Sequence, residues 1–212
     1  MFLVGLTGNY GMGKSTVLHM FRKFGVITID ADKIVESLLE EKSVLENIRE
    51  LLGDRVFDKN GSLNKKKIVD IIFDNNALRH SLEDTLHPLV FEKIKDFLDK
   101  MNEKDKVAMI EVPLLFERGY EDRFDRTITI YTKEEVALNR LEKDGVNREE
   151  AVLRLKAQLP IEEKIKRADY VIDNNGTPEE TMGQVERIYN KLLKEAEEGN
   201  NQRSRELQRE LS

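Results

Sequence analysis

The amino-acid sequence predicts an α/β fold in which helices cover both faces of a five-stranded parallel sheet. Two observations favour this fold. Short apolar runs rich in β-branched residues alternate along the 212 residues with longer segments whose apolar residues recur at helical spacing. A glycine-rich loop also joins the first apolar run directly to the first helical segment. The five expected strands are 2–6, 26–29, 107–112, 126–131 and 170–172.

The first two strands each end at residues suited to chemistry. A glycine-rich loop follows strand 2–6, and a helix is expected over 14–24. The second strand, 26–29, ends at Asp30-Ala31-Asp32. Because ligands of parallel sheets bind beyond the carboxyl ends of the strands, we expect the functional residues at these two ends and after Val112.

A long helical stretch separates the second strand from the third. The helical pattern continues from residue 33 to about 102, which is longer than a usual crossover between parallel strands. We therefore expect an all-helical insert at 33–90. A longer helix is expected from Leu86 to Met101, entered through His87-Pro88 with the proline in its first turn.

The C-terminal part returns to alternating strands and helices. Thr132 is expected to cap a helix, with Glu135 three residues later completing a capping box. Residues 133–168 are helical and strongly charged, and the last helix is expected over 178–196. The tail, 199–212, is almost wholly polar, so we expect it to be flexible.

The composition excludes several classes of protein. The chain has no cysteine, which excludes disulfides, a cysteine nucleophile and thiolate metal sites. Its 35 basic and 41 acidic residues give a net charge of −6, whereas a general nucleic-acid binder would have a basic excess. The sequence has no apolar run long enough to cross a membrane and no basic leader before its first apolar run, so we expect a cytoplasmic protein.

The loop from Gly8 to Ser15 carries the most specific motif, since it fits G-x-x-x-x-G-K-[ST]. Backbone N–H groups in such a loop, together with the positive end of the following helix, bind phosphate oxygens. We expect Lys14 to reach the β- and γ-phosphates and the Ser15 hydroxyl to ligate Mg²⁺. The alternative is a glycine-rich turn that binds nothing. The remaining expected nucleotide contacts are Gly11, Met12, Gly13 and Thr16.

Three carboxylates stand near the expected strand ends. Of Asp30 and Asp32, one could accept a proton from an attacking hydroxyl or orient it, while the other could hold metal-bound water or cap the next helix. Plain capping by both is the alternative. Glu111 is the only charged residue of the third strand. Because a buried carboxylate is costly without a partner, we favour a contact to magnesium-bound water or to the glycine-rich loop.

Among the basic residues of 133–168, Arg140 is the candidate for a functional role. It lies one to two turns into the helix after the fourth strand, from which its side chain can return to the cleft and neutralise transition-state charge. The other basic residues there are typical of solvated i,i+4 pairs. His87 precedes a proline within an apolar stretch, which is more typical of a structural histidine than of a catalyst.

The sequence resembles the dephospho-coenzyme A kinase family over about four-fifths of its length. The phosphate-loop motif is common to many families, whereas the combination of the other blocks is specific. The matching blocks are Gly5–Gly8, Gly13–Val17, Ile29–Ile34, Asp58–Leu63, Leu86–Leu89, Pro113–Glu117, Gln158–Pro160, Glu163-Lys164 and Ala168–Asn174. Asn9 departs from the pattern, because the family usually carries a second glycine there.

The resemblance implies a three-layer P-loop kinase with three parts. These are a nucleotide-binding core (1–32, 91–132 and 169–198), a helical domain for the coenzyme (33–90) and a helical lid (133–168). The implied reaction transfers phosphate from ATP to the ribose 3′-hydroxyl of dephospho-coenzyme A, with Mg²⁺. The implied partners are these two small molecules and neither nucleic acid nor membrane, with the chain as a monomer or small homo-oligomer.

The resemblance also implies roles for individual residues. Asp32 takes the position of the carboxylate facing the acceptor hydroxyl, and Arg140 that of a phosphate-contacting arginine. Asn174 lies on the nucleotide side. The implied acceptor-side residues are Lys65, His87 and Leu114, of which Lys65 replaces a usual arginine.

Two other functions are compatible with a phosphate loop. A nucleoside monophosphate kinase would need an arginine-rich acceptor pocket, but the insert offers only Arg49, Arg55 and Arg79. A GTP-dependent switch would need Asp-x-x-Gly after the third strand, where this chain has Pro113–Phe116.

Overall fold

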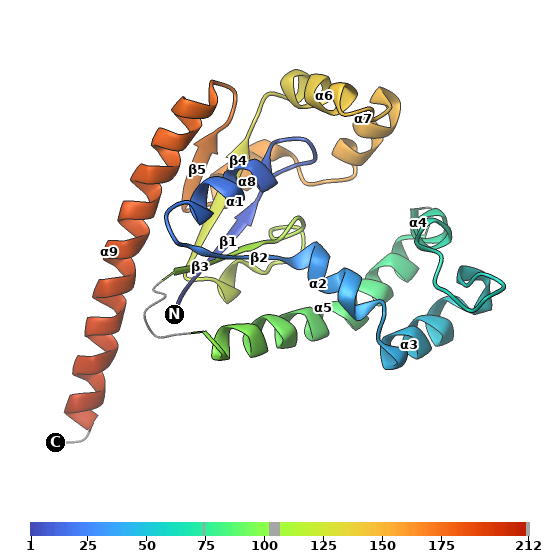
Figure 1. Cartoon of the computed structure of the whole chain (residues 1–212), viewed down its shortest axis with the longest axis horizontal. Helices are drawn as coiled ribbons and strands as arrows, with labels where there is room; N and C mark the ends of the chain where they lie inside the picture. Colours follow the sequence, from blue (N-terminus) through green and yellow to red (C-terminus); the bar gives the residue numbers. More distant parts are fainter. Residues whose placement is uncertain (74, 102–106, 211–212) are drawn as a thin grey trace. The chain divides into compact units, whose positions relative to one another are not determined.

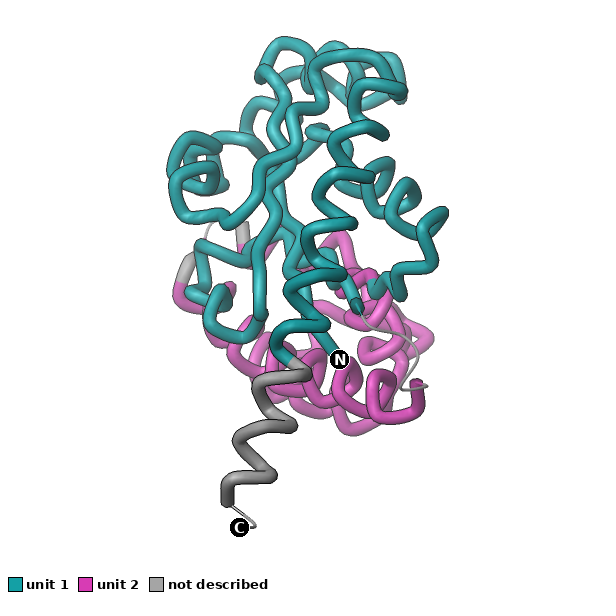
Figure 2. The backbone as a smooth tube through the Cα atoms, turned by 90° about the vertical axis from the view of Figure 1, so that its left-hand side faces the viewer, with its two compact units in different colours: residues 1–29, 102–212 teal, residues 30–101 magenta. Residues whose placement is uncertain are grey.

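The chain forms two compact units in the computed structural model, which describes residues 1–73, 75–101 and 107–210 and, of residues 73, 76 and 200–210, only the backbone. The first unit comprises Met1–Ile29 and Asn102–Ser212, and the second comprises Asp30–Met101 (Figure 2). No helix within the described residues has the length and apolarity needed to span a bilayer.

A five-stranded sheet forms the centre of the first unit, as the sequence predicts. Its strands are β1 (Phe2–Thr7), β2 (Ile27–Asp30), β3 (Val107–Glu111), β4 (Arg126–Tyr131) and β5 (Tyr170–Asp173). Their spatial order is β2-β3-β1-β4-β5, and β1 pairs in parallel with β3 and β4 (Figure 1). Because β1 is central and later strands lie on both sides of it, the loop after β1 lies at a topological switch point.

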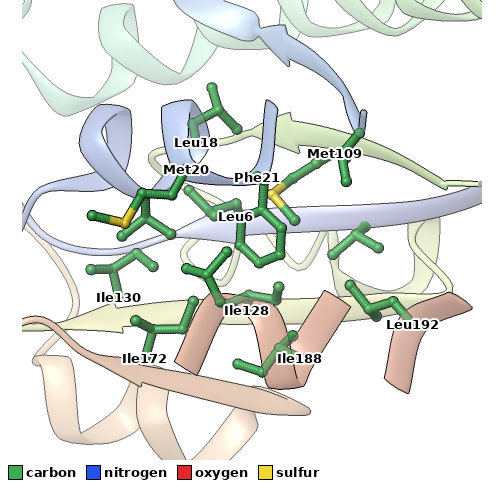
Figure 3. Close-up of a cluster of buried hydrophobic side chains, with 14 of the residues drawn as sticks. Leu6, Leu18, Met20, Phe21, Met109, Ile128, Ile130, Ile172, Ile188 and Leu192 are labelled. Carbon is green, nitrogen blue, oxygen red and sulfur yellow. The ribbon is translucent and has the colours of Figure 1, made fainter. Parts of the chain in front are cut away.

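Alternate residues of the central strand β1 face opposite sides of the sheet. Val4 and Leu6 are fully buried in the core cluster shown in Figure 3. Gly5 faces the other side, where a Cβ would overlap Leu115 and Phe124. A strand buried on both faces explains why the predicted run is continuously apolar rather than alternating.

Helices α1 (Lys14–Arg22) and α9 (Pro178–Glu210) contribute the helical side of that core. Phe21 of α1 is fully buried, and Val185, Ile188 and Leu192 recur along α9 at helical spacing (Figure 3). Burial of a side chain of this size stabilises the fold by about 1.5–3 kcal/mol. These contacts fix the helix that begins at the glycine-rich loop against the sheet.

Helix α9 is longer than the predicted 178–196. Its backbone continues to Glu210, because residues 197–210 contain glutamate, glutamine, arginine and leucine, which favour helix, and no proline. The predicted tail, 199–212, is therefore helical in backbone as far as Glu210, and residues 211–212 lie outside the described residues. The flexibility of the tail stays a prediction.

A polar contact also joins α9 to the edge of the sheet. The Tyr170 hydroxyl donates to Glu195 Oε1 at 2.6 Å, and Arg126 Nε pairs with Glu195 Oε2 at 3.0 Å. Burial, followed by the neighbouring Glu195, raises the pKa of Tyr170 to about 12. The phenol therefore stays protonated at neutral pH and remains a hydrogen-bond donor to the helix.

The charged region between β4 and β5 contains three helices. They are α6 (Glu134–Lys143), α7 (Arg148–Lys156) and α8 (Ile161–Arg167). Helices α6 and α7 share a small apolar cluster of Leu138, Leu141, Ala151 and Leu155, against which Tyr10 packs. Helix α8 instead packs on β4. The predicted lid thus has a small apolar core of its own within the first unit.

The predicted capping box at the start of α6 is wrong. The N-cap of α6 is Lys133, and it has no side-chain capping hydrogen bond. Thr132 is fully buried, and its hydroxyl donates to the carbonyl of Met12 at 3.1 Å. The Thr132 hydroxyl bonds to Met12 and not to the amides at the start of α6, and a pattern of neighbouring residues cannot reveal such a tertiary contact.

The second unit is all-helical. It contains α2 (Ala31–Leu38), α3 (Lys42–Leu52), a short 3₁₀ helix η1 (Asp54–Val56), α4 (Lys65–Phe73) and α5 (Asn76–Asp99). Helices α2, α3 and α4 all pack against α5. The unit ends at Met101 rather than at residue 90, because α5 is one continuous helix that the predicted boundary would have divided.

Helix α5 begins earlier than predicted. Asn75 caps it by accepting from the amide of Leu78 at 3.0 Å, so Pro88 lies inside the helix and not in its first turn. Proline removes one i→i−4 hydrogen bond there. The helix continues because buried apolar residues at four-residue spacing lie both before and after the proline. These residues are Leu82, Leu86, Val90 and Ile94.

Candidate active site

The glycine-rich loop between β1 and α1 has the backbone geometry of an anion site. Gly11 and Gly13 have φ values of +75° and +91°, in the left-handed region that favours glycine. Gly13 is the N-cap of α1, and its carbonyl accepts the amide of Val17 at 3.1 Å as the first helical hydrogen bond. First-turn amides have no intrahelical acceptor, so this end of α1 presents donors to an anion.

Buried hydrogen bonds support the loop from beneath. The carbonyl of Met12 accepts from Thr132 Oγ1 and from Asn174 Nδ2, at 3.1 and 3.0 Å. Asn174 Oδ1 in turn accepts from Thr181 Oγ1 at 3.0 Å. The Asn174 side chain is thus hydrogen-bonded both to the loop and to α9. Its expected contact with nucleotide stays a prediction. Sequence reasoning missed Thr132 and Thr181, since nothing local distinguishes them.

Arg140 lies beside the loop, as its position on α6 predicts. Its Nη2 donates to the carbonyl of Asn174 at 2.8 Å. Its Nη1 lies 3.9 Å from the point that a Cβ on Gly13 would occupy. A guanidinium held at the end of α1 adds positive charge where phosphate oxygens would bind.

The predicted phosphate and magnesium residues begin α1. Lys14 Nζ donates to the carbonyl of Asn9 at 3.4 Å, which folds the side chain back over the loop. Ser15 and Thr16 are exposed in the first turn. Among the described residues, no three acidic or histidine side chains cluster as metal ligands. The predicted role of Ser15 as a ligand of Mg²⁺ stays a prediction.

Two more predicted residues lie at the end of β3. Glu111 is buried and in register with Leu6, the residue before the last of β1. The structure therefore brings this carboxylate to the sheet edge where the loop begins. Leu114 is half-buried in the turn that follows β3. Their roles toward magnesium-bound water and the acceptor, respectively, stay predictions.

A second set of hydrogen bonds reaches the loop from the segment between α7 and α8. Gln158 Oε1 accepts the amide of Tyr10 at 2.8 Å, and Asn9 Nδ2 donates to the carbonyl of Leu159 at 3.1 Å. Sequence reasoning assigned these residues no role in the site. The only sign in the sequence that this segment has a role is that Gln158-Leu159-Pro160 is one of the blocks that resemble the kinase family.

The remaining predicted residues belong to the second unit. Asp30 caps α2, since its Oδ1 accepts the amides of Asp32 and Lys33 at 3.0 and 3.4 Å. Asp32 is exposed in the first turn of that helix. Lys65 pairs with Glu36 at 3.2 Å, one helical turn beyond Asp32, so the ammonium lies toward the face that carries Asp32.

His87 is half-buried on α5. Like Asp32 and Lys65, it remains a predicted acceptor residue. Of the two carboxylates after β2, Asp30 is the helix cap, and the role of Asp32 stays a prediction.

We expect Thr132→Val to test the support beneath the loop. The change keeps the shape of the side chain and removes its hydrogen bond to the carbonyl of Met12. A typical buried hydrogen bond contributes about 1 kcal/mol, so the free energy of unfolding should fall by about that amount in urea titration. Thr85→Val is the matched control, because that hydroxyl bonds only within its own helix. An equal effect of the two changes would argue against a special role for Thr132.

Known proteins resemble this chain along most of its length. A model of the family described as Dephospho-CoA kinase matches residues 2–180. A dephospho-CoA kinase of Aquifex aeolicus is 38% identical over 193 residues, covering 91% of this chain and 98% of the relative. One of Fusobacterium nucleatum is 40% identical over 189 residues, covering 89% and 97%. A crystal structure of a Thermus thermophilus protein matches with a TM-score of 0.80 at 31% identity, covering 89% of this chain and 95% of that one.

Proposed function

Because the chain belongs to the dephospho-CoA kinase family, we propose that it transfers the γ-phosphoryl group of ATP to the ribose 3′-hydroxyl of dephospho-coenzyme A. The products are coenzyme A and ADP. The family match across residues 2–180 is the single observation that carries the identity of the acceptor. The nucleoside monophosphate kinase reading is not favoured, since none of the relatives named above is such an enzyme.

The glycine-rich loop supplies the donor side of this reaction. We assign backbone contacts with the ATP phosphates to Gly11–Gly13 and Thr16, and charge neutralisation to Lys14 and Arg140. Their placement at the N-terminus of α1 supports the assignment. Ser15 would hold Mg²⁺, which supplies further neutralisation of phosphate charge when bound. Glu111 would act through water bound to the metal.

We assign the acceptor side to residues after β2 and β3 and in the second unit. The ribose hydroxyl oxygen forms the new bond to γ-phosphorus, and the bond from that phosphorus to the β,γ-bridging oxygen of ATP breaks. The hydroxyl proton passes to the Asp32 carboxylate, and ADP leaves with the bridging oxygen. Lys65, His87 and Leu114 would orient the coenzyme. A cytoplasmic location stays a prediction of the sequence.

A coupled assay of ADP release tests the proposal directly. Dephospho-coenzyme A, AMP, CMP and adenosine are compared as acceptors, with a reaction lacking acceptor as the blank. We expect turnover with dephospho-coenzyme A at least a hundredfold above the blank. Equal turnover with AMP or CMP would instead support a nucleoside monophosphate kinase.

We also propose that residues 133–168 act as a lid over the nucleotide. The small shared cluster of α6 and α7 supports this, because a segment that buries little apolar surface opens at low cost. We expect backbone amides of α6 and α7 to exchange hydrogen more slowly when an ATP analogue and Mg²⁺ are present. Mass-spectrometric exchange measures this, with α9 as the internal reference. Unchanged exchange in α6 and α7 would contradict a closing lid.

A further inference from the structure

The first unit buries one ion pair that the proposed reaction does not use. Lys164 of α8 has a fully buried side chain, and its Nζ lies 2.7 Å from Oε1 of Glu117, whose side chain is 16% exposed. The ammonium also donates to the carbonyl of Pro113 at 3.3 Å. Burial lowers the pKa of the Lys164 ammonium, while the hydrogen bond and charge of Glu117 oppose that shift.

Glu117 lies in the segment after β3, and Lys164 reaches it from α8. The carbonyl of Pro113 also accepts from the hydroxyl of Thr7, the last residue of β1, at 3.2 Å. The carbonyl of Lys164 accepts from Thr129 of β4 at 3.4 Å. The ion pair is therefore anchored to three neighbouring strands and has little freedom to move.

Glu117 extends this rigid anchor to the segment between α7 and α8. The same Oε1 that contacts Lys164 also accepts the backbone amide of Leu159 at 3.1 Å. The carbonyl of Leu159 then accepts from Asn9, and the neighbouring Gln158 accepts from the amide of Tyr10. A continuous series of hydrogen bonds thus runs from the buried pair, through residues 158–159, to the first half of the glycine-rich loop.

We propose that Glu117, oriented by Lys164, is a positioning residue for nucleotide binding. It fixes residues 158–159, and they hold Asn9 and Tyr10 so that the loop has its binding conformation before ATP arrives. This inference rests on the proposed nucleotide site. A binding-competent loop populated only one-tenth of the time would raise the nucleotide dissociation constant tenfold. Once nucleotide is bound, the loop is ordered and the chemical step proceeds as before.

Two double variants at Glu117 and Lys164 distinguish an effect on the position of the loop from an effect on the stability of the fold. Removing one partner of a buried pair leaves an uncompensated charge, whereas replacing both is often neutral. Glu117→Leu with Lys164→Met removes the pair and the acceptor for Leu159. Glu117→Gln with Lys164→Met removes the pair but keeps an acceptor at that place. Asn9→Gly removes one of the two hydrogen bonds by which residues 158–159 reach the loop, and leaves the bond from the amide of Tyr10 to Gln158. Lys166→Met is the control, because Lys166 pairs with Glu163 on the exposed side of the same helix.

Calorimetry with a non-hydrolysable ATP analogue and Mg²⁺ measures the dissociation constants, and steady-state assays at saturating ATP measure kcat. We expect the constant to rise about tenfold in the leucine–methionine variant. It should rise by less in Asn9→Gly, because that variant keeps the bond from the amide of Tyr10 to Gln158. It should stay within threefold of the parent protein in the glutamine–methionine variant and in Lys166→Met. The kcat should change less than threefold in both double variants and in Lys166→Met.

Three results would overturn the proposal. One is equal analogue affinity for the leucine- and glutamine-containing double variants. Another is an analogue affinity of Asn9→Gly equal to that of Lys166→Met, a comparison that remains available if a double variant does not fold. The third is a fall in kcat with unchanged affinity, which would place the pair in the chemical step. The parent protein is assayed with dephospho-coenzyme A in parallel. If the proposed function is wrong, this assay shows no turnover, whereas the comparison of analogue affinities among the variants remains valid.

Discussion

Replacing Lys14 with alanine is expected to lower kcat/KM for ATP by about 10³-fold in a protein that remains folded. The ammonium lies over the glycine-rich loop, where it would contact the oxygens that gain charge as the β,γ-bond of ATP breaks. Loss of a single preorganised hydrogen-bond donor to a developing negative charge typically lowers kcat by about 10²–10³-fold. Because Lys14 also carries a full positive charge, we expect an effect at the upper end of that range. Ser15→Ala should likewise abolish useful turnover, because it removes the proposed ligand of Mg²⁺.

The matched control is Lys23→Ala, which removes an exposed lysine from the other end of α1. Its kcat/KM should stay within twofold of the parent value. Urea titration of all three variants establishes that they fold. Parent-like kcat in folded Lys14→Ala would refute the assignment of the loop as a phosphate site.

Changing Asp32 to asparagine is expected to lower kcat by about 10²–10⁴-fold, the usual contribution of a general base. A ribose hydroxyl is a weak nucleophile that must lose its proton as the bond to phosphorus forms. Asparagine keeps the shape of the side chain and loses the charge that would receive that proton. Affinity for the ATP analogue should barely change, since the variant leaves the glycine-rich loop intact.

Asp30→Asn is the matched control for Asp32→Asn, because Asp30 is the N-cap of α2 and asparagine caps helices about as well as aspartate. We expect it to lower kcat less than tenfold. If Asp32→Asn keeps its kcat and weakens only ATP binding, Asp32 belongs to the nucleotide site and the proposed proton transfer is wrong.

The fold class was predictable because its strongest signals are local. Each strand of the sheet is a short run that contains apolar and β-branched residues, so the signal for it lies in neighbouring residues. The comparisons and the structure confirm that class. The start of α5 was not predictable from Pro88, because proline signals a first turn only when tertiary packing does not continue the helix through it.

The donor side of the site was predictable for a similar reason. The motif at 8–15 is contiguous, and a strand before it and a helix after it supply its context. The residues that support the loop were not predictable. Thr132 and Lys164 contact the loop or its supports through partners far away in the sequence, and Thr181 acts through Asn174, whose bond to Met12 spans 162 residues. Asn9 is an example. In the sequence it is only a departure from the usual glycine, whereas in the structure its side-chain amide donates to the carbonyl of Leu159.

The discontinuity of the first unit has a consequence for synthesis on the ribosome. Strand β1 is made first, but its partner residues in β3 and β4 follow more than a hundred residues later. At roughly 5–20 residues per second, β1 waits roughly 5–20 s for a neighbour. The second unit is one continuous stretch of chain, Asp30–Met101, whose helices make contacts local in sequence, so it can form during that interval. The glycine-rich loop is therefore translated well before the strands beside it and acquires its final conformation only after they have been made.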